Sequence, residues 1–100
     1  MYDLDIKEEA DEIFKKLEKK NRKQLEIIDK KIKEIQLNPQ HIYKFLRAPL
    51  QAFNRVHIDN HFALIFKINH QDKVVEVYYF DHHDRVYKWR PKNDDGAARI

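Results

Sequence analysis

The hydrophobic period of this 100-residue chain changes once, and that change constrains its fold more than any other pattern in the sequence. Up to about residue 37, apolar side chains recur every three or four residues, as they do on one face of a helix. These positions are Ala10, Ile13, Phe14, Leu17, Leu25, Ile28, Ile32 and Ile35. They predict helices over 7–20 and 23–37, which pack as an antiparallel hairpin. Pro39 ends the second helix because it disfavours the α conformation at Asn38.

After residue 52 the pattern is that of β-strands separated by short turns. Strands are predicted over 53–58, 61–69 and 73–81, and one further strand over 2–6 precedes the helices. The predicted fold class is α+β: a strand, two helices and a three-stranded antiparallel meander, with the helices packed on one sheet face and the other face partly open. Strict alternation in the last strand places Val75, Val77 and Tyr79 on one face, and Val74, Glu76, Tyr78 and Phe80 on the other.

The length of the chain predicts one domain, over 1–90, followed by a flexible C-terminal tail over 91–100. With no cysteine and a single glycine, disulfides, thiolate catalysis and glycine-rich phosphate loops are excluded. No apolar run approaches the roughly 20 residues that span a bilayer, so we expect a cytoplasmic protein without membrane association. The remaining chemistry is that of His, Tyr, Arg and Lys.

Basic residues are concentrated in two blocks that contain no acid. The first block holds Lys44, Arg47 and Arg55, and the second holds Arg85, Lys88, Arg90 and Lys92. The net charge of the chain is only +3, so the distribution of charge is more informative than its sum. If the fold brings the two blocks together, they form a patch for a polyanion such as RNA. The predicted RNA-binding residues are Lys44, Arg47, Arg85, Lys88 and Arg90.

A second set of residues is suited to cleaving RNA without a metal. Alternation along 53–58 places Arg55 and His57 on one strand face, and we expect His83 and Tyr87 to reach the same edge from the segment after the last strand. The reaction needs a base for the ribose 2′-hydroxyl, an acid for the departing 5′-oxygen and cations for the phosphate. Arg55, His57, His83 and Tyr87 are therefore the predicted catalytic residues.

Each of these residues also has a structural alternative. Arg55 can form a cross-strand ion pair with Glu76, and Tyr87 can simply pack its ring on the sheet. His83 can be an ordinary surface imidazole, and Trp89 either caps the core or contacts a partner.

The run Asp81-His82-His83-Asp84 has the composition of a metal cluster. Neighbouring residues of a strand point to opposite faces, however, and the sequence contains no spaced zinc motif. We therefore expect no metal and no cofactor.

Four short strings, taken in order and spacing, resemble the RelE/ParE superfamily of toxins and especially archaeal RelE-type toxins. They are Leu46-Arg47-Ala48-Pro49-Leu50, Arg55-Val56-His57-Ile58, Phe62-Ala63-Leu64-Ile65-Phe66 and His82-His83-Asp84-Arg85-Val86-Tyr87. The resemblance covers about residues 1–90. It implies the toxin of a type II toxin–antitoxin system, a ribosome-dependent mRNA endoribonuclease (mRNA interferase) that inhibits translation. It also implies inhibition by an acidic RelB-like antitoxin, and it allows a toxin–antitoxin heterotetramer.

The resemblance assigns roles to individual positions. Arg55 and His57 match an alternating basic pair on a central strand, Arg47 a basic position before the sheet, and Tyr87 a tyrosine that contributes to the reaction. The sequence departs from the family pattern at Ala63 and His83, where many members carry Arg. Two alternatives therefore stay open: a ParE-like toxin that poisons gyrase, and a catalytically weak member that acts as an antitoxin-binding module.

Overall fold

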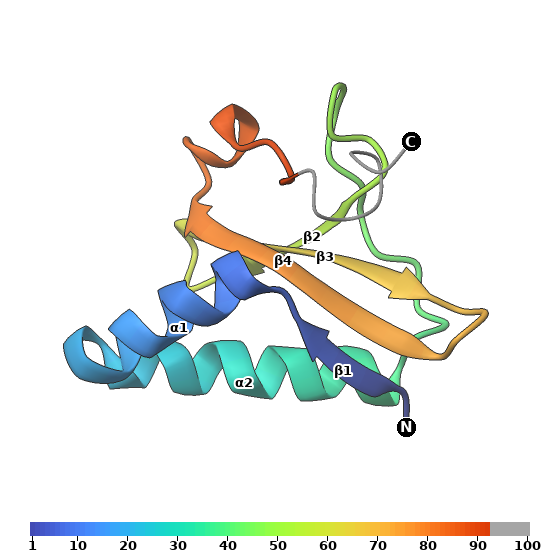
Figure 1. Ribbon diagram of the computed structural model, residues 1–100, viewed down its shortest axis with the longest axis horizontal. Helices are drawn as coiled ribbons and strands as arrows, with labels where there is room; N and C mark the ends of the chain where they lie inside the picture. The colour runs from blue at the N-terminus through green and yellow to red at the C-terminus, as the bar shows by residue number, and fades with distance from the viewer. Residues whose placement is uncertain (93–100) are drawn as a thin grey trace.

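The helical and β halves of the chain form two layers (Figure 1). The structure is a computed structural model and describes residues 1–92, so most of the tail predicted over 91–100 lies outside the described residues. In order, the elements are β1 (Asp3–Ile6), α1 (Glu8–Lys20), α2 (Arg22–Leu37), β2 (Asn54–Ile58), β3 (Phe62–Asn69), β4 (Val74–His82) and a short 3₁₀ helix, η1 (Val86–Lys88). The predicted order is confirmed, and each predicted boundary of a helix or strand differs by at most one residue.

The four strands form one sheet in the order β1-β4-β3-β2. β2, β3 and β4 pair antiparallel as the predicted meander, and β1 adds to β4 in parallel. Asp59 and Asn60 take positive φ angles in the β2–β3 turn, a conformation that Asp and Asn tolerate better than most residues. This turn lies at the same end of the sheet as the end of β4, where Phe62 pairs with His82.

The helices cover one face of the sheet, as predicted (Figure 1). Their apolar stripes pack against alternate residues of the strands and form the larger core. Its buried members are Ala10, Phe14, Ile28, Ile32, Ile35, Ile58, Leu64, Phe66, Val75, Val77 and Phe80. The side chain of Asn21 caps α2 by accepting a hydrogen bond from the backbone N–H of Gln24 at 3.1 Å, which fixes the sharp link between the helices.

The opposite face of the sheet is open only in part, because two irregular segments cover it (Figure 1). The segment before β2 and the segment after β4 contribute to a second core, made of Leu46, Leu50, Phe53, Ala63, Ile65, Tyr78, Val86 and Trp89. Trp89 is buried, and its indole N–H donates to the carboxylate of Glu9 at 2.9 Å. Trp89 therefore caps this core. Arg55 and His57 lie beside the covered region.

The prediction of strict alternation along β4 is wrong at its C-terminal half. The register with β3 shifts so that Ile65 pairs with Tyr79 and Phe66 with Val77, which leaves Tyr78 as an extra residue. Phe80 consequently packs in the helix-covered core with Val77, while Tyr79 packs on the second core. Such a bulge reverses the faces of all later residues, and it depends on pairing that a single strand does not reveal.

Candidate active site

One pocket lies where β2, the segment before it and the segment after β4 meet. Its volume is about 390 Å³, and it is lined by Arg47, Arg55, His57, Ala63, His83, Asp84, Val86 and Tyr87. The antiparallel pairing of His57 with Ala63 places the end of β2 beside the turn that leads into β3. The C-terminal segment then brings its side chains to the same edge. The four predicted catalytic residues and Arg47 thus line one pocket.

Arg55 and His57 contact each other along β2. Arg55 Nη1 lies 3.0 Å from His57 Nε2, so the guanidinium donates to an unprotonated imidazole nitrogen. The backbone N–H of Arg55 donates to the carbonyl of Lys44 at 2.9 Å, which holds this part of β2 in place. The cross-strand pair with Glu76 does not form, because Glu76 lies on β4 and β3 separates the two strands. Arg55 therefore lines the pocket instead of pairing with Glu76.

Tyr87 is joined to Arg47 by three contacts. Its hydroxyl oxygen accepts from the Arg47 backbone N–H at 3.1 Å and from Arg47 Nε at 3.4 Å, and the guanidinium carbon lies 4.7 Å from the ring centroid. Burial raises the pKa of the Tyr87 phenol, but the hydrogen bonds from Arg47 and the charges of Arg47 and Arg55 outweigh it and leave the pKa below its ordinary value. The hydroxyl is thus easier to ionise than a free tyrosine.

His83 lies on the rim of the pocket, beyond the end of β4. Its Nδ1 is 3.1 Å from a carboxylate oxygen of Asp84, and its backbone N–H donates to the carbonyl of His61 at 2.8 Å. The His83 and Asp84 side chains are exposed, so the imidazole can meet a substrate. Asp84 is not among the site residues predicted from the sequence. The signal in the sequence that could have identified Asp84 is its position directly after His83.

The other predicted RNA-binding residues do not line the pocket. Lys44, Arg85 and Lys88 are exposed and lie in the two chain segments that contribute to the pocket, but their side chains do not line it. The guanidinium of Arg90 binds the backbone of the preceding residues: it donates to the carbonyl oxygens of Tyr87 at 2.8 Å and Trp89 at 2.7 Å. Of the two basic blocks, the first therefore contributes Arg47 and Arg55 to the pocket, and the second contributes no Lys or Arg.

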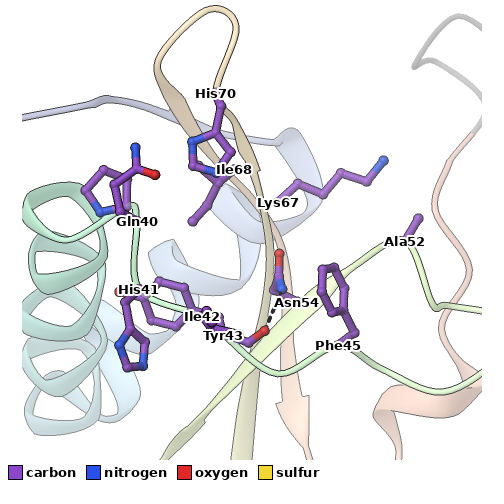
Figure 2. Close-up of a pocket in the computed structure, with 11 residues that line it drawn as sticks. Gln40, His41, Ile42, Tyr43, Phe45, Ala52, Asn54, Lys67, Ile68 and His70 are labelled. Carbon is purple, nitrogen blue, oxygen red and sulfur yellow. Dashed lines mark hydrogen bonds between the residues drawn. The ribbon is translucent and has the colours of Figure 1, made fainter.

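A second hollow, of about 490 Å³, lies toward the other end of β3 (Figure 2). His41, Tyr43, Asn54, Lys67 and His70 are among its lining residues, and Asn54 Nδ2 donates to the Tyr43 carbonyl at 3.2 Å. Ala63 in the first pocket and Ile68 in this one are five residues apart on β3, or about 17 Å. None of the predicted catalytic residues lines this hollow, so it is a separate surface.

Fold and pocket together define a small α+β protein with a cationic pocket suited to a phosphate-containing substrate. No family model matches the chain. It is 52% identical over 87 residues to an uncharacterized protein of Methanosarcina mazei, covering 87% of this chain and all of that protein. It is 48% identical over 88 residues to the Methanocaldococcus jannaschii protein named "Putative toxin RelE4", covering 88% of this chain and 93% of that protein. The chain belongs to the RelE family of toxins of toxin–antitoxin systems, and the resemblance seen in the sequence is confirmed.

Solved structures share the fold at low sequence identity. A double arginine-to-alanine mutant of Escherichia coli RelE in the free state has a TM-score of 0.70 at 21% identity, over 99% of this chain and 97% of that one. A metal-bound toxin from Helicobacter pylori has a TM-score of 0.72 at 18% identity, over 86% and 99%. The intact E. coli RelBE toxin–antitoxin complex contains a chain with a TM-score of 0.63 at 22% identity, over 82% and 96%. These likenesses confirm the α+β fold class.

The helices of the described residues, 1–92, include none with both the length and the apolar character needed to cross a membrane.

Proposed function

We propose that this protein is a ribosome-dependent mRNA endoribonuclease. The observation that carries the proposal is the single pocket in which Arg47, Arg55, His57, His83 and Tyr87 converge. In the proposed reaction the ribose 2′-oxygen attacks the adjacent phosphorus, the bond to the 5′-oxygen breaks, and a 2′,3′-cyclic phosphate and a 5′-hydroxyl result. The proposed reaction requires no metal ion. Such a reaction on ribosomes would take place in the cytoplasm.

Arg47 and Arg55 would bind the scissile phosphate. Guanidinium groups hold phosphate with paired hydrogen bonds and stay charged at any working pH. Each is already held in the pocket, Arg47 by the Tyr87 hydroxyl and Arg55 by His57 Nε2. His57 would thus act mainly by positioning Arg55. Ala63, where many family members carry Arg, also lines the pocket, so these two guanidiniums would carry the phosphate charge without a third.

His83 and Tyr87 would move the protons. An imidazole can serve as base or acid in such a reaction, and the Asp84 carboxylate 3.1 Å from Nδ1 holds the His83 ring in place. The depressed pKa of Tyr87 lets its hydroxyl exchange a proton more readily than an ordinary phenol. Two proton carriers at one phosphate-binding pocket satisfy the need for one base and one acid.

The decisive experiment measures cleavage on ribosomes programmed with a defined mRNA. We expect the wild type to cut within the ribosome-bound message and leave 5′-hydroxyl and 2′,3′-cyclic phosphate ends. The double variant Arg55→Ala/Tyr87→Phe should lose cleavage, whereas Lys19→Ala, which removes an exposed basic residue of α1 that does not line the pocket, should retain it. Intact mRNA together with gyrase-dependent DNA damage would instead indicate a ParE-like toxin. Tight antitoxin binding without toxicity would indicate a binding module.

We further propose an acidic RelB-like antitoxin as the partner. The chain carries a net charge of +3, and its pocket presents two arginines at the surface of the sheet. Electrostatic complementarity of this kind speeds association and selects partners. The E. coli toxin of the same fold is known in complex with RelB. A heterotetramer of two toxins and two antitoxins is the assembly we would test for by light scattering of the purified complex.

A further inference from the structure

Three histidines gather at the end of the sheet next to the candidate active site. His61 comes from the β2–β3 turn, His82 is the last residue of β4, and His83 follows it. One ring nitrogen of each lies within 4.8 Å of the others. The rings are nearly parallel. The ring centroids of His82 and His83 are 4.9 Å apart with an interplanar angle of 24°, and those of His61 and His82 are 6.1 Å apart with an angle of 5°.

Backbone contacts hold this trio together. The N–H of His83 donates to the carbonyl of His61 at 2.8 Å, and Phe62 pairs with His82 in the β3–β4 register. The expectation that neighbouring side chains diverge does not hold at His82 and His83, because His83 lies beyond the end of the strand. The approach of His61 depends on the turn, and no sequence spacing reveals it.

The chemistry of the trio is that of a metal site. In a tetrahedral site with bonds of about 2.0–2.1 Å, neighbouring ligand nitrogens are about 3.3 Å apart. The rings need to close by roughly 1.5 Å, which modest side-chain rotations can supply, since His61 and His83 are exposed. Imidazole is a preferred ligand of zinc, copper and nickel ions, whereas magnesium and calcium prefer oxygen.

Asp84 supplies the groups expected around such a ligand set. Its carboxylate oxygens lie 3.1 Å from His83 Nδ1 and 3.5 Å from His82 Nδ1. A carboxylate that accepts from Nδ1–H fixes the tautomer in which Nε2 is free, and it makes the ring a better ligand. His82 Nδ1 also lies 3.3 Å from the backbone N–H of Asp84, so metal binding would select one of its two tautomers.

We propose that His61, His82 and His83 bind a late first-row divalent cation such as Zn²⁺, with a water in the fourth position and Asp84 in the outer shell. The site shares His83 and Asp84 with the candidate active site, whereas His61 lies outside that pocket. A bound cation occupies the imidazole that the proposed nuclease needs for proton transfer. Zn²⁺ is therefore an inhibitor of cleavage, a consequence that rests on the proposed function.

Isothermal titration of the full, tag-free chain with Zn²⁺ tests the site directly. We expect one equivalent to bind, and His61→Ala to weaken the affinity by at least about tenfold, since loss of even an outer-shell group costs 10–100-fold. His41→Ala removes an exposed histidine at the other end of the sheet and should leave affinity unchanged. Equal affinities for wild type and His61→Ala would overturn the proposal. Circular dichroism confirms that each variant folds, and His82→Ala provides a second ligand variant.

Zn²⁺ titrated into the cleavage reaction tests the consequence. The wild type should slow as Zn²⁺ saturates the site, and His61→Ala should cut at the wild-type rate without responding to Zn²⁺. Its backbone carbonyl, which positions His83, remains. Equal inhibition of both proteins would overturn the link to His83. If the wild type cut no RNA at all, the proposed nuclease would fail, while the calorimetric comparison would still decide the metal site.

Discussion

At the scale of single residues, two tyrosines show how their surroundings set opposite acidities. Burial and a hydrogen bond to Asp81 raise the pKa of Tyr79 to about 12. Hydrogen bonds from Arg47 and the charge of two arginines lower the pKa of Tyr87, despite an opposing effect of burial. Tyr79 therefore holds its phenolic proton more tightly than a free tyrosine, and Tyr87 holds its proton less tightly.

The lowered pKa gives a prediction that needs no substrate. In a spectrophotometric titration, the difference between wild type and Tyr87→Phe isolates the Tyr87 phenol, and we expect its midpoint below the ordinary value of about 10. Arg47→Ala removes both the side-chain hydrogen bond and the nearer charge, so the midpoint should move up toward that value. Tyr43→Phe serves as the control subtraction, because the Tyr43 hydroxyl donates to the Asn38 carbonyl at 3.0 Å and burial raises the pKa of this phenol. An unchanged midpoint in Arg47→Ala would mean that Arg47 does not lower the pKa of Tyr87.

Removing the hydroxyl should also slow the proposed reaction. We expect Tyr87→Phe alone to reduce single-turnover cleavage on ribosomes by about 10²-fold or more, the usual contribution of a positioned proton carrier. If Tyr87 acts as the base, the rate rises with pH until its phenol ionises, and Arg47→Ala shifts that rise to higher pH. A Tyr87→Phe enzyme with the wild-type rate at every pH would assign the tyrosine to packing alone.

At the scale of elements, the sequence predicted what local periodicity decides and missed what pairing decides. The helices follow from apolar spacing, and Arg55 and His57 share a face because strands alternate. The β4 bulge at Tyr78 and the cover over the second face depend on contacts between distant segments. For the same reason His61 escaped prediction, since a turn rather than sequence spacing brings it to His83. Asp84 directly follows His83 in the sequence, but adjacency alone does not show that its carboxylate contacts the imidazole.

The C-terminal segment that carries Tyr87 is fixed to the sheet by Trp89. Its ring stacks on the Tyr79 ring with the centroids 5.2 Å apart, and its indole N–H donates to the carboxylate of Glu9 in α1 at 2.9 Å. We expect Trp89→Ala to lower the free energy of unfolding by about 3–5 kcal/mol. Trp89→Phe, which keeps an aromatic ring but loses the hydrogen bond, should cost at least about 1 kcal/mol.

Urea unfolding followed by circular dichroism measures the stability of both Trp89 variants. Tryptophan fluorescence cannot be used, because Trp89 is the one tryptophan of the chain. The neighbouring exposed residue gives a matched control: Lys88→Ala should change stability by less than about 0.5 kcal/mol. A Trp89→Ala protein as stable as Lys88→Ala would show that the second core contributes little.

At the scale of the whole molecule, positive and negative side chains are unevenly distributed. The helices carry acids and bases together, including the Asp11–Lys15 pair at 3.1 Å, so their charges largely compensate. The pocket, in contrast, presents Arg47 and Arg55 with only Asp84 among its lining acids. Among the residues that line this pocket, two arginines therefore face one carboxylate.

This distribution predicts how the proposed antitoxin binds. Because attraction between exposed charges is screened within about 8 Å at physiological salt, the association rate constant should fall by about tenfold between 50 and 300 mM NaCl. The pocket variant Arg47→Ala/Arg55→Ala should bind more slowly and show a flatter salt dependence. Lys19→Ala/Lys20→Ala removes the same charge from the exposed end of α1 and should change the dependence less. Stopped-flow mixing with an acidic RelB-like peptide measures all three proteins. An association rate that ignores salt in the wild type would mean that apolar contacts, rather than the pocket arginines, govern recognition.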